Sequence, residues 1–355
     1  MNRSADMEQV NNKRIIQFDV LRILAAFTVV LLHVNDSNFA CSFPSQEWEY
    51  RNIYGALVRW CVPVFVMISG ALFLNLSKEI SIKTLFTKNI FRIIYVFFFW
   101  AIPYAIYDGF ANHNTNIFFI IGLAIDGEFH LWFLKMLVGL YLAVPILRVI
   151  VQKKRIEEYF IALAILTAFF IPMLNTVIGM FSETAKGYAV RYFEVFSLKI
   201  ATGYVGYFVL GHYLNTYRLS AGVKRIIYVM GCLSVLLAAG ITHWYSHSTG
   251  AVLRGFYNYL NLFTLMETLA VFLFVRDLNV SPKFHPIIMK LSSLSFGVYL
   301  VHIFVYRFAY DIFHIDGNSF NPSFFIPCLS LIIFVISCLI VAIMKKIPIL
   351  QKFVM

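Results

Sequence analysis

Three ionisable side chains, Asp19, Arg22 and His33, lie inside the first long apolar stretch of the sequence, residues 15–34. Such groups are costly within a membrane span and are retained mainly where they perform a function. Arg22 and His33 are eleven residues apart, and eleven helical steps of about 100° come within about 20° of three full turns. The two side chains therefore share one helix face, about 16 Å apart along the axis. The imidazole is the group suited to proton transfer near pH 7.

Each of these residues also has a purely structural interpretation. A histidine at the end of a span often lies at the interface, and Arg22 can extend back toward the lipid headgroups. Asp19 and Arg22, three residues apart, can neutralise each other. None of these explanations accounts for the shared face of Arg22 and His33, so a polar track along this helix remains the sharper hypothesis.

The composition places the whole chain in a membrane. Of its 355 residues, 60% are apolar and only 13% are charged, unlike a soluble globular protein. Residues 1–14 are predicted to form a tail, and residues 15–350 an all-α polytopic bundle of about ten transmembrane helices. The expected spans are 15–34, 54–75, 91–110, 131–151, 159–180, 198–217, 225–246, 256–276, 288–310 and 324–344.

The net charge of +11 is explained by the positions of the basic residues. Most Lys and Arg fall in alternate segments between the expected spans, as the positive-inside rule requires, so both termini are expected in the cytoplasm. The bilayer is therefore the expected partner, and nucleic acid is not. The five cysteines are scattered and form no CxxC pair, so the cysteine pattern predicts neither a disulfide framework nor a zinc site.

Four segments of the chain carry a resemblance to a known family. Residues 18–22, Phe-Asp-Val-Leu-Arg, followed by His33, resemble the first-helix signature of the acyltransferase family 3 membrane proteins, an Arg and a His with ten intervening residues. Matching segments follow in order: residues 62–70, residues 130–134 (His-Leu-Trp-Phe-Leu) and residues 291–302. The resemblance spans about residues 14–350. It implies a bacterial cytoplasmic-membrane enzyme that moves an acyl group, usually acetyl from acetyl-CoA, onto a hydroxyl of a surface glycan or its lipid-linked precursor.

The chemistry of that reaction assigns roles to the first helix. Acyl transfer from a thioester to an alcohol needs a base near the hydroxyl, and His33 is the candidate. Arg22 and Asp19 complete the catalytic candidates, with Arg22 toward the cytoplasmic end where the donor phosphates would bind. Acetyl-CoA is expected as donor substrate, and no metal is expected.

The donor-binding candidates are Arg92 and Lys88. The family's third helix often opens with two Arg residues three apart, whereas here Asn89 stands in the first position, beside Lys88. Because Lys cannot form the bidentate fork that Arg makes with a phosphate, Arg92 is the stronger candidate.

Four further residues are secondary candidates, each with a structural alternative. Glu267 lies midway along its span, where a protonated carboxyl hydrogen-bonded to neighbouring threonines or to another helix is the alternative. His302 is more readily a satisfied buried histidine than a catalytic one. His130 and Trp132 lie near the outer interface, where amphipathic rings commonly anchor spans.

Two other function classes remain open on the sequence. An exporter or flippase of a lipid-linked sugar also needs intramembrane polar groups, although these would be spread over several helices. A sensor or scaffold would usually bring a soluble domain, and no polar stretch is long enough for one. The sequence does not indicate an oligomeric state.

Overall fold

The computed structural model describes residues 14–37, 39–40, 42–195 and 201–354, which form helices and turns and contain no strand. Nine helical segments in this part of the chain are long and apolar enough to cross a membrane, so the all-α polytopic architecture is confirmed. The helices are α2 (Ile16–Asp36), α3 (Gln46–Leu57), α4 (Cys61–Phe73), α5 (Ile82–Thr84), α6 (Phe91–Ala111), α7 (Ile117–Asp126), α8 (Trp132–Ile150), α9 (Lys154–Ala164), α10 (Ile171–Phe181), α11 (Glu183–Val195), α12 (Val205–Thr216), α13 (Ala221–Thr249), α14 (Leu262–Arg276), α15 (His285–Ser292), α16 (Ser295–Phe313), α17 (Pro322–Met344) and α18 (Pro348–Gln351).

The expected span 198–217 is the point at which the structure differs from the sequence prediction. In its described part, residues 201–217, the α-helix is α12, whose twelve residues measure about 18 Å, short of a hydrocarbon core about 30 Å thick. Most of its side chains are buried against other helices. The apolar run therefore reflects burial inside the bundle. Residues 1–13 of the predicted tail and 198–200 of this span lie outside the described residues.

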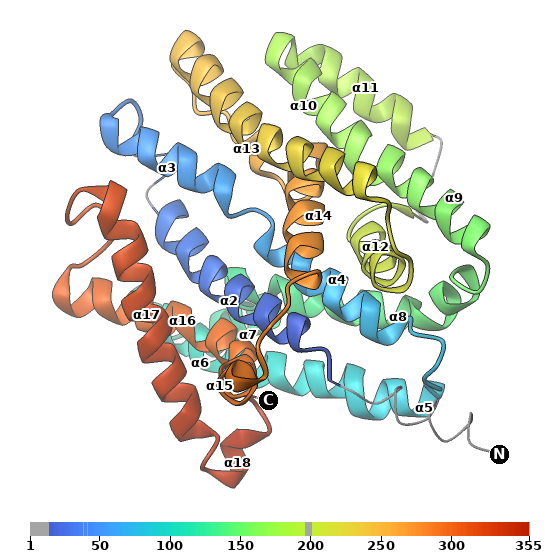
Figure 1. Ribbon diagram of the computed structural model, residues 1–355. Helices are drawn as coiled ribbons and strands as arrows, with labels where there is room; N and C mark the ends of the chain where they lie inside the picture. Colours follow the sequence, from blue (N-terminus) through green and yellow to red (C-terminus); the bar gives the residue numbers. More distant parts are fainter. Residues whose placement is uncertain (1–13, 38, 41, 196–200, 355) are drawn as a thin grey trace.

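Helix α2 lies at the centre of the bundle (Figure 1). It is continuous for 21 residues, because the segment is apolar and has no proline or glycine to interrupt it. It packs against α4 on one side and against α15, α16 and α17 on the other. Both ends of its polar track are therefore enclosed by helices from distant parts of the sequence.

Helices α4 and α12 meet through a reciprocal pair of glycines. A Cβ built on Gly70 would lie 1.8 Å from the carbonyl oxygen of Phe208, and one on Gly211 would lie 2.0 Å from that of Met67. Only glycine permits two helix backbones to approach so closely. The contact holds α4, which lines the site described below, against the buried α12.

We expect Gly70→Ala to lower the free energy of unfolding by about 1–3 kcal/mol or more, because the new methyl group forces the two backbones apart. Gly139→Ala in α8 is the matched control, since nothing lies within 4 Å of its added Cβ. Thermal unfolding in detergent, followed by intrinsic fluorescence, measures both variants. Equal midpoints for the two would contradict the close contact.

Candidate active site

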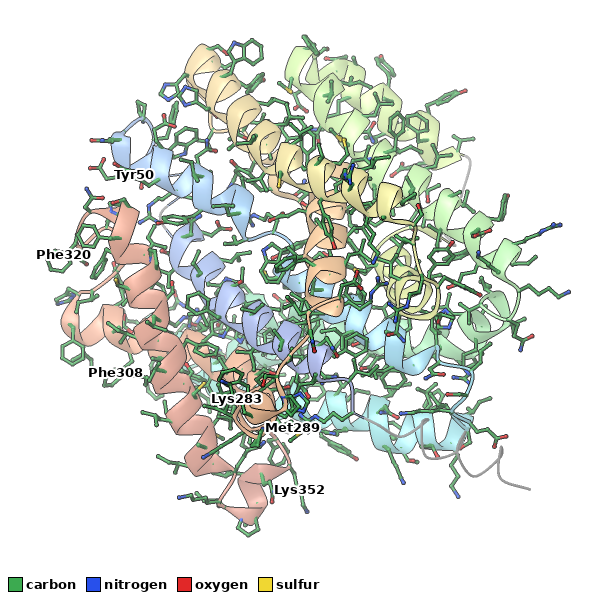
Figure 2. The ribbon with its side chains drawn as sticks, viewed as in Figure 1. Tyr50, Lys283, Met289, Phe308, Phe320 and Lys352 are labelled. Atoms are coloured by element: carbon green, nitrogen blue, oxygen red, sulfur yellow. The ribbon has the colours of Figure 1, made fainter. Side chains whose placement is uncertain are left out.

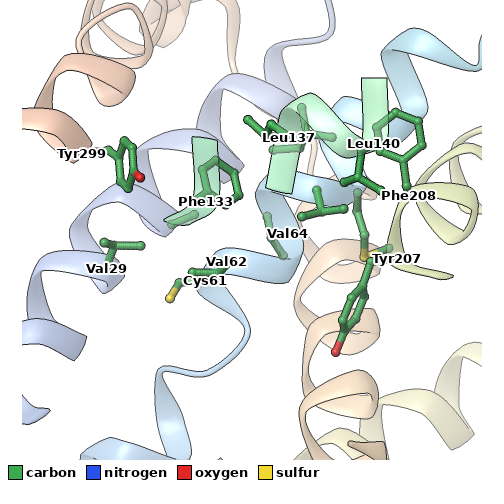
Figure 3. Close-up of a cluster of buried hydrophobic side chains, with 14 of the residues drawn as sticks. Val29, Cys61, Val62, Val64, Phe133, Leu137, Leu140, Tyr207, Phe208 and Tyr299 are labelled. Atoms are coloured by element: carbon green, nitrogen blue, oxygen red, sulfur yellow. The ribbon is translucent and has the colours of Figure 1, made fainter. Parts of the chain in front are cut away.

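A cavity of about 330 Å³ lies between α2, α4, α6, α8 and α16. Three cationic side chains line it: Arg22 of α2, together with Lys88 and Arg92 from the start of the third span. Its remaining walls are mainly apolar and aromatic, and Figure 3 shows five of these lining side chains within the buried cluster: Val29, Val62, Phe133, Leu137 and Tyr299. We call this space the cationic cavity. The structure thus brings together the three cations that the sequence assigned to donor binding.

A widened helical turn carries the basic residues of the third span. Leu85–Ile90 is a π-helix that runs directly into α6, and such turns occur frequently at functional sites. Lys88, Asn89 and Arg92 all line the cationic cavity. Asn89 stands where the resembled family often has an arginine. It still lines the cavity, and it offers a side-chain amide in place of a second guanidinium group.

Asp19 is fully buried and pairs with Arg22. Its carboxylate accepts hydrogen bonds from Arg14 (2.5 and 2.9 Å), from Nη1 of Arg22 (3.2 Å) and from the Ser292 hydroxyl (2.6 Å). It does not line the cationic cavity. This geometry ties α2 to α15 and favours Asp19 as a positioning residue for Arg22.

Three histidines meet near the far end of α2. The ring of His33 stacks on that of His302 of α16, with centroids 5.2 Å apart and planes at 29°. The His130 ring lies edge-on to His302 at 5.4 Å. We call these three residues the histidine cluster. Two of the secondary candidates therefore lie beside the principal one, an arrangement that depends entirely on tertiary packing.

The histidine cluster holds several unused polar atoms. Nδ1 of His302 lies 2.7 Å from the Tyr299 carbonyl oxygen, which can only accept, so Nδ1 carries the proton and Nε2 holds the lone pair. That Nε2 and both ring nitrogens of His130 are buried with no hydrogen-bond partner among the described residues. Buried polar atoms are rarely left unpaired in structural regions. The cluster therefore has buried ring nitrogens available to pair with another group.

A second cavity, of about 240 Å³, opens on the other side of the histidine cluster. We call it the His33 cavity, and it is lined by His33, Asp36, Ser37, Phe129, Ile303, Tyr306 and Arg307. On α2 and α16, Val29 and Tyr299 line the cationic cavity, while His33 and Ile303 lie four residues further on, about 6 Å along each helix. One helical turn, occupied by the histidine cluster, therefore separates the two cavities.

Ion pairs fix the rim of the His33 cavity. Arg307 donates to Asp108 (2.5 Å) and to Glu128 (2.8 Å). Burial raises the pKa of the Glu128 carboxyl to about 7, although the Arg307 cation opposes this shift. On the opposite side, the buried Arg59 donates to both oxygens of Asp36 (2.9 and 3.0 Å). No local sequence pattern indicates the pairs of Arg307, because this residue lies 199 and 179 residues from its two partners.

The other two secondary candidates lie apart from the histidine cluster. Trp132 packs against the rings of Tyr204 and Tyr259, at 5.5 and 5.9 Å. Glu267 is buried on α14 and lines neither cavity. The hydroxyls of Thr264 and Thr268 beside it donate to the backbone carbonyls of residues 258 and 264.

A cation-lined cavity one helical turn from a cluster of buried histidines forms a polar site inside a polytopic helical bundle. A family model described as an acyltransferase domain, that of acyltransferase family 3, matches residues 15–342. The chain belongs to this family and is a membrane acyltransferase. No curated protein and no solved structure matches the chain.

Proposed function

We propose that the protein transfers an acyl group, acetyl from acetyl-CoA, to a hydroxyl of a surface glycan or its lipid-linked precursor in a bacterial cytoplasmic membrane. One observation carries this proposal: three cations line a cavity whose far wall lies one helical turn from His33. A donor with phosphates at one end and a reactive thioester at the other matches that separation of charge and imidazole.

The donor binds with its phosphates on Arg22, Lys88 and Arg92. Arg92 and Arg22 supply forked donors to phosphate oxygens, and Lys88 adds a point charge. The cavity of about 330 Å³ is at the small end of the range for small-molecule pockets, about 300–1,000 Å³. It accommodates the pantetheine arm between its apolar walls, while the nucleotide stays at the mouth.

His33 acts as the general base in this proposal. It takes the proton of the acceptor hydroxyl as that oxygen attacks the thioester carbonyl. The tetrahedral intermediate then collapses, the carbon–sulfur bond breaks, and the coenzyme A thiolate takes the proton back from the imidazolium. His302, stacked on His33, holds the ring in place. Asp19 positions Arg22 and stays outside the reaction.

The charge bias of the sequence favours opposite sides of the membrane for the two cavities. With the N-terminus in the cytoplasm, the cationic cavity faces the cytoplasm, where acyl-CoA is made, and the His33 cavity faces outward. We propose that the acyl arm threads along α2 to meet an outward-facing acceptor. The distance of about 16 Å between Arg22 and His33 suits an extended arm.

This arrangement predicts the accessibility of a single cysteine. In a cysteine-depleted background, His33→Cys should react with membrane-impermeant thiol reagents from the outside of intact cells, and acyl-CoA loaded into right-side-out vesicles should protect it. Ser37→Cys, in the same cavity, and Ser69→Cys, in the cationic cavity, are the matched controls. Labelling of His33→Cys only from the cytoplasmic side of inverted vesicles would overturn the threading model and favour a cytoplasmic acceptor.

The enzymatic proposal is tested with purified protein in nanodiscs and acetyl-CoA labelled in the acetyl group. We expect label to be transferred to a glycan-containing membrane fraction. Release of the coenzyme A thiol should require that fraction, and transfer of label should be accompanied by release of the thiol. Movement of a lipid-linked sugar across the bilayer without consumption of the thioester would instead support the exporter or flippase.

A further inference from the structure

A cluster of two histidines and one glutamate lies on the surface, apart from both cavities. Oε2 of Glu49 lies 2.8 Å from Nδ1 of His243, and Oε1 lies 2.8 Å from Nε2 of His247. The ligand atoms of all three side chains lie within 4.8 Å of one another. Glu49 comes from α3 and the histidines from α13, two helices that pack together. Figure 2 labels Tyr50, the residue after Glu49, on α3.

The spacing within α13 is that of a chelating pair. His243 and His247 are four residues apart and project from the same helix face, with ring centroids 4.6 Å apart. Two imidazoles and one carboxylate form the donor set of many zinc sites, in which a water molecule completes the tetrahedron. Ligand atoms about 2.0–2.2 Å from zinc are about 3.3 Å from one another. A small opening of the present contacts would therefore admit the ion.

Neighbouring side chains orient the cluster. The rings of Phe43 and Trp48 pack against His247, at 5.2 and 5.8 Å. The Ser45 hydroxyl accepts from the Trp48 backbone N–H (3.2 Å) and so begins α3 one turn before Glu49. The three ligand side chains remain 33–52% exposed, so an ion can enter and keep a coordinated water.

We propose that Glu49, His243 and His247 bind one Zn²⁺ ion and that the ion links α3 to α13. Because the ligands lie 194 and 198 residues apart in the sequence, the folded chain binds the ion more tightly than the unfolded chain. The ion therefore stabilises the fold. The site uses no cysteine, which is why the cysteine pattern does not indicate it.

Zinc binding is tested on the full chain carrying a tag without histidines, stripped with a chelator and titrated with ZnCl₂ by calorimetry. We expect one ion bound per chain, a higher unfolding temperature with zinc, and no comparable effect of Mg²⁺, which prefers oxygen ligands. Glu49→Gln, His243→Ala and His247→Ala should each weaken zinc binding by at least about tenfold.

His113→Asn is the matched control, because His113 is an exposed histidine outside the cluster and asparagine tolerates its positive φ. It should bind zinc as the unsubstituted protein does. Size-exclusion chromatography establishes that each variant is folded, and Glu49→Gln preserves side-chain size. Absence of saturable zinc binding, or unchanged binding by the three cluster variants, would overturn the proposal.

Discussion

His33→Ala is expected to lower the rate of acyl transfer by about 100-fold or more, the usual scale for loss of a general base. His33 is the member of the histidine cluster that also lines the His33 cavity, where an acceptor hydroxyl would enter. Its substitution removes the group that takes the hydroxyl proton and leaves the three cations in place. The effect should appear in kcat, measured as acyl transfer by the purified protein.

The result counts only if the variant is folded and inserted. A thermal unfolding midpoint equal to that of the unsubstituted protein establishes that the variant is folded. His113 lines neither cavity, so His113→Asn should keep normal turnover. A well-inserted His33→Ala protein with near-normal turnover would refute the role of His33. If His302→Ala were then inactive, the base would be His302, whose Nε2 has no hydrogen-bond partner among the described residues.

The second large effect concerns the donor. Arg22→Gln and Arg92→Gln should each raise KM for acyl-CoA by about 10–100-fold, because a hydrogen bond to a charged group contributes about 1.5–3 kcal/mol. The phosphates keep their charge throughout the reaction, so the loss is one of uniform binding and kcat should change little. Lys88→Gln should have a smaller effect, since it removes a point charge.

Lys83→Gln serves as the control for the loss of a positive charge, because Lys83 is exposed near the same end of the bundle and does not line the cationic cavity. Its KM values should stay unchanged. Steady-state kinetics with each substrate varied in turn separates the two sites. If Arg22→Gln and Arg92→Gln changed KM for the acceptor and left acyl-CoA binding intact, the donor role would be wrong.

The membrane fold was predictable because apolar length is a strong local signal. Runs such as residues 15–34 and 324–344 correspond to α2 and α17, and neither prediction depends on how the helices pack. Helix α12 shows where this signal fails. An apolar run buried among other helices has the same composition as a lipid-facing span, so hydropathy alone cannot give its length.

Residue spacing by itself predicted the site only where it lies on one helix. Arg22 and His33 share a continuous helix, so their spacing along α2 followed from its regular geometry. His33 stacks on His302, and the zinc candidates Glu49 and His247 lie together, although each pair is separated by about 200 residues or more in the sequence. No local pattern encodes such pairs. The same holds for the ion pairs of Arg307 and Arg59 at the rim of the His33 cavity.

The most direct test of the account is a cryo-electron-microscopy structure with a non-cleavable thioether analogue of acetyl-CoA. We predict that its phosphates lie against Arg22, Lys88 and Arg92, with the arm between the walls of the cationic cavity and the thioether beside the histidine cluster. Phosphates bound instead at the opposite end, against Arg59 or Arg307, would contradict the proposed path of the donor.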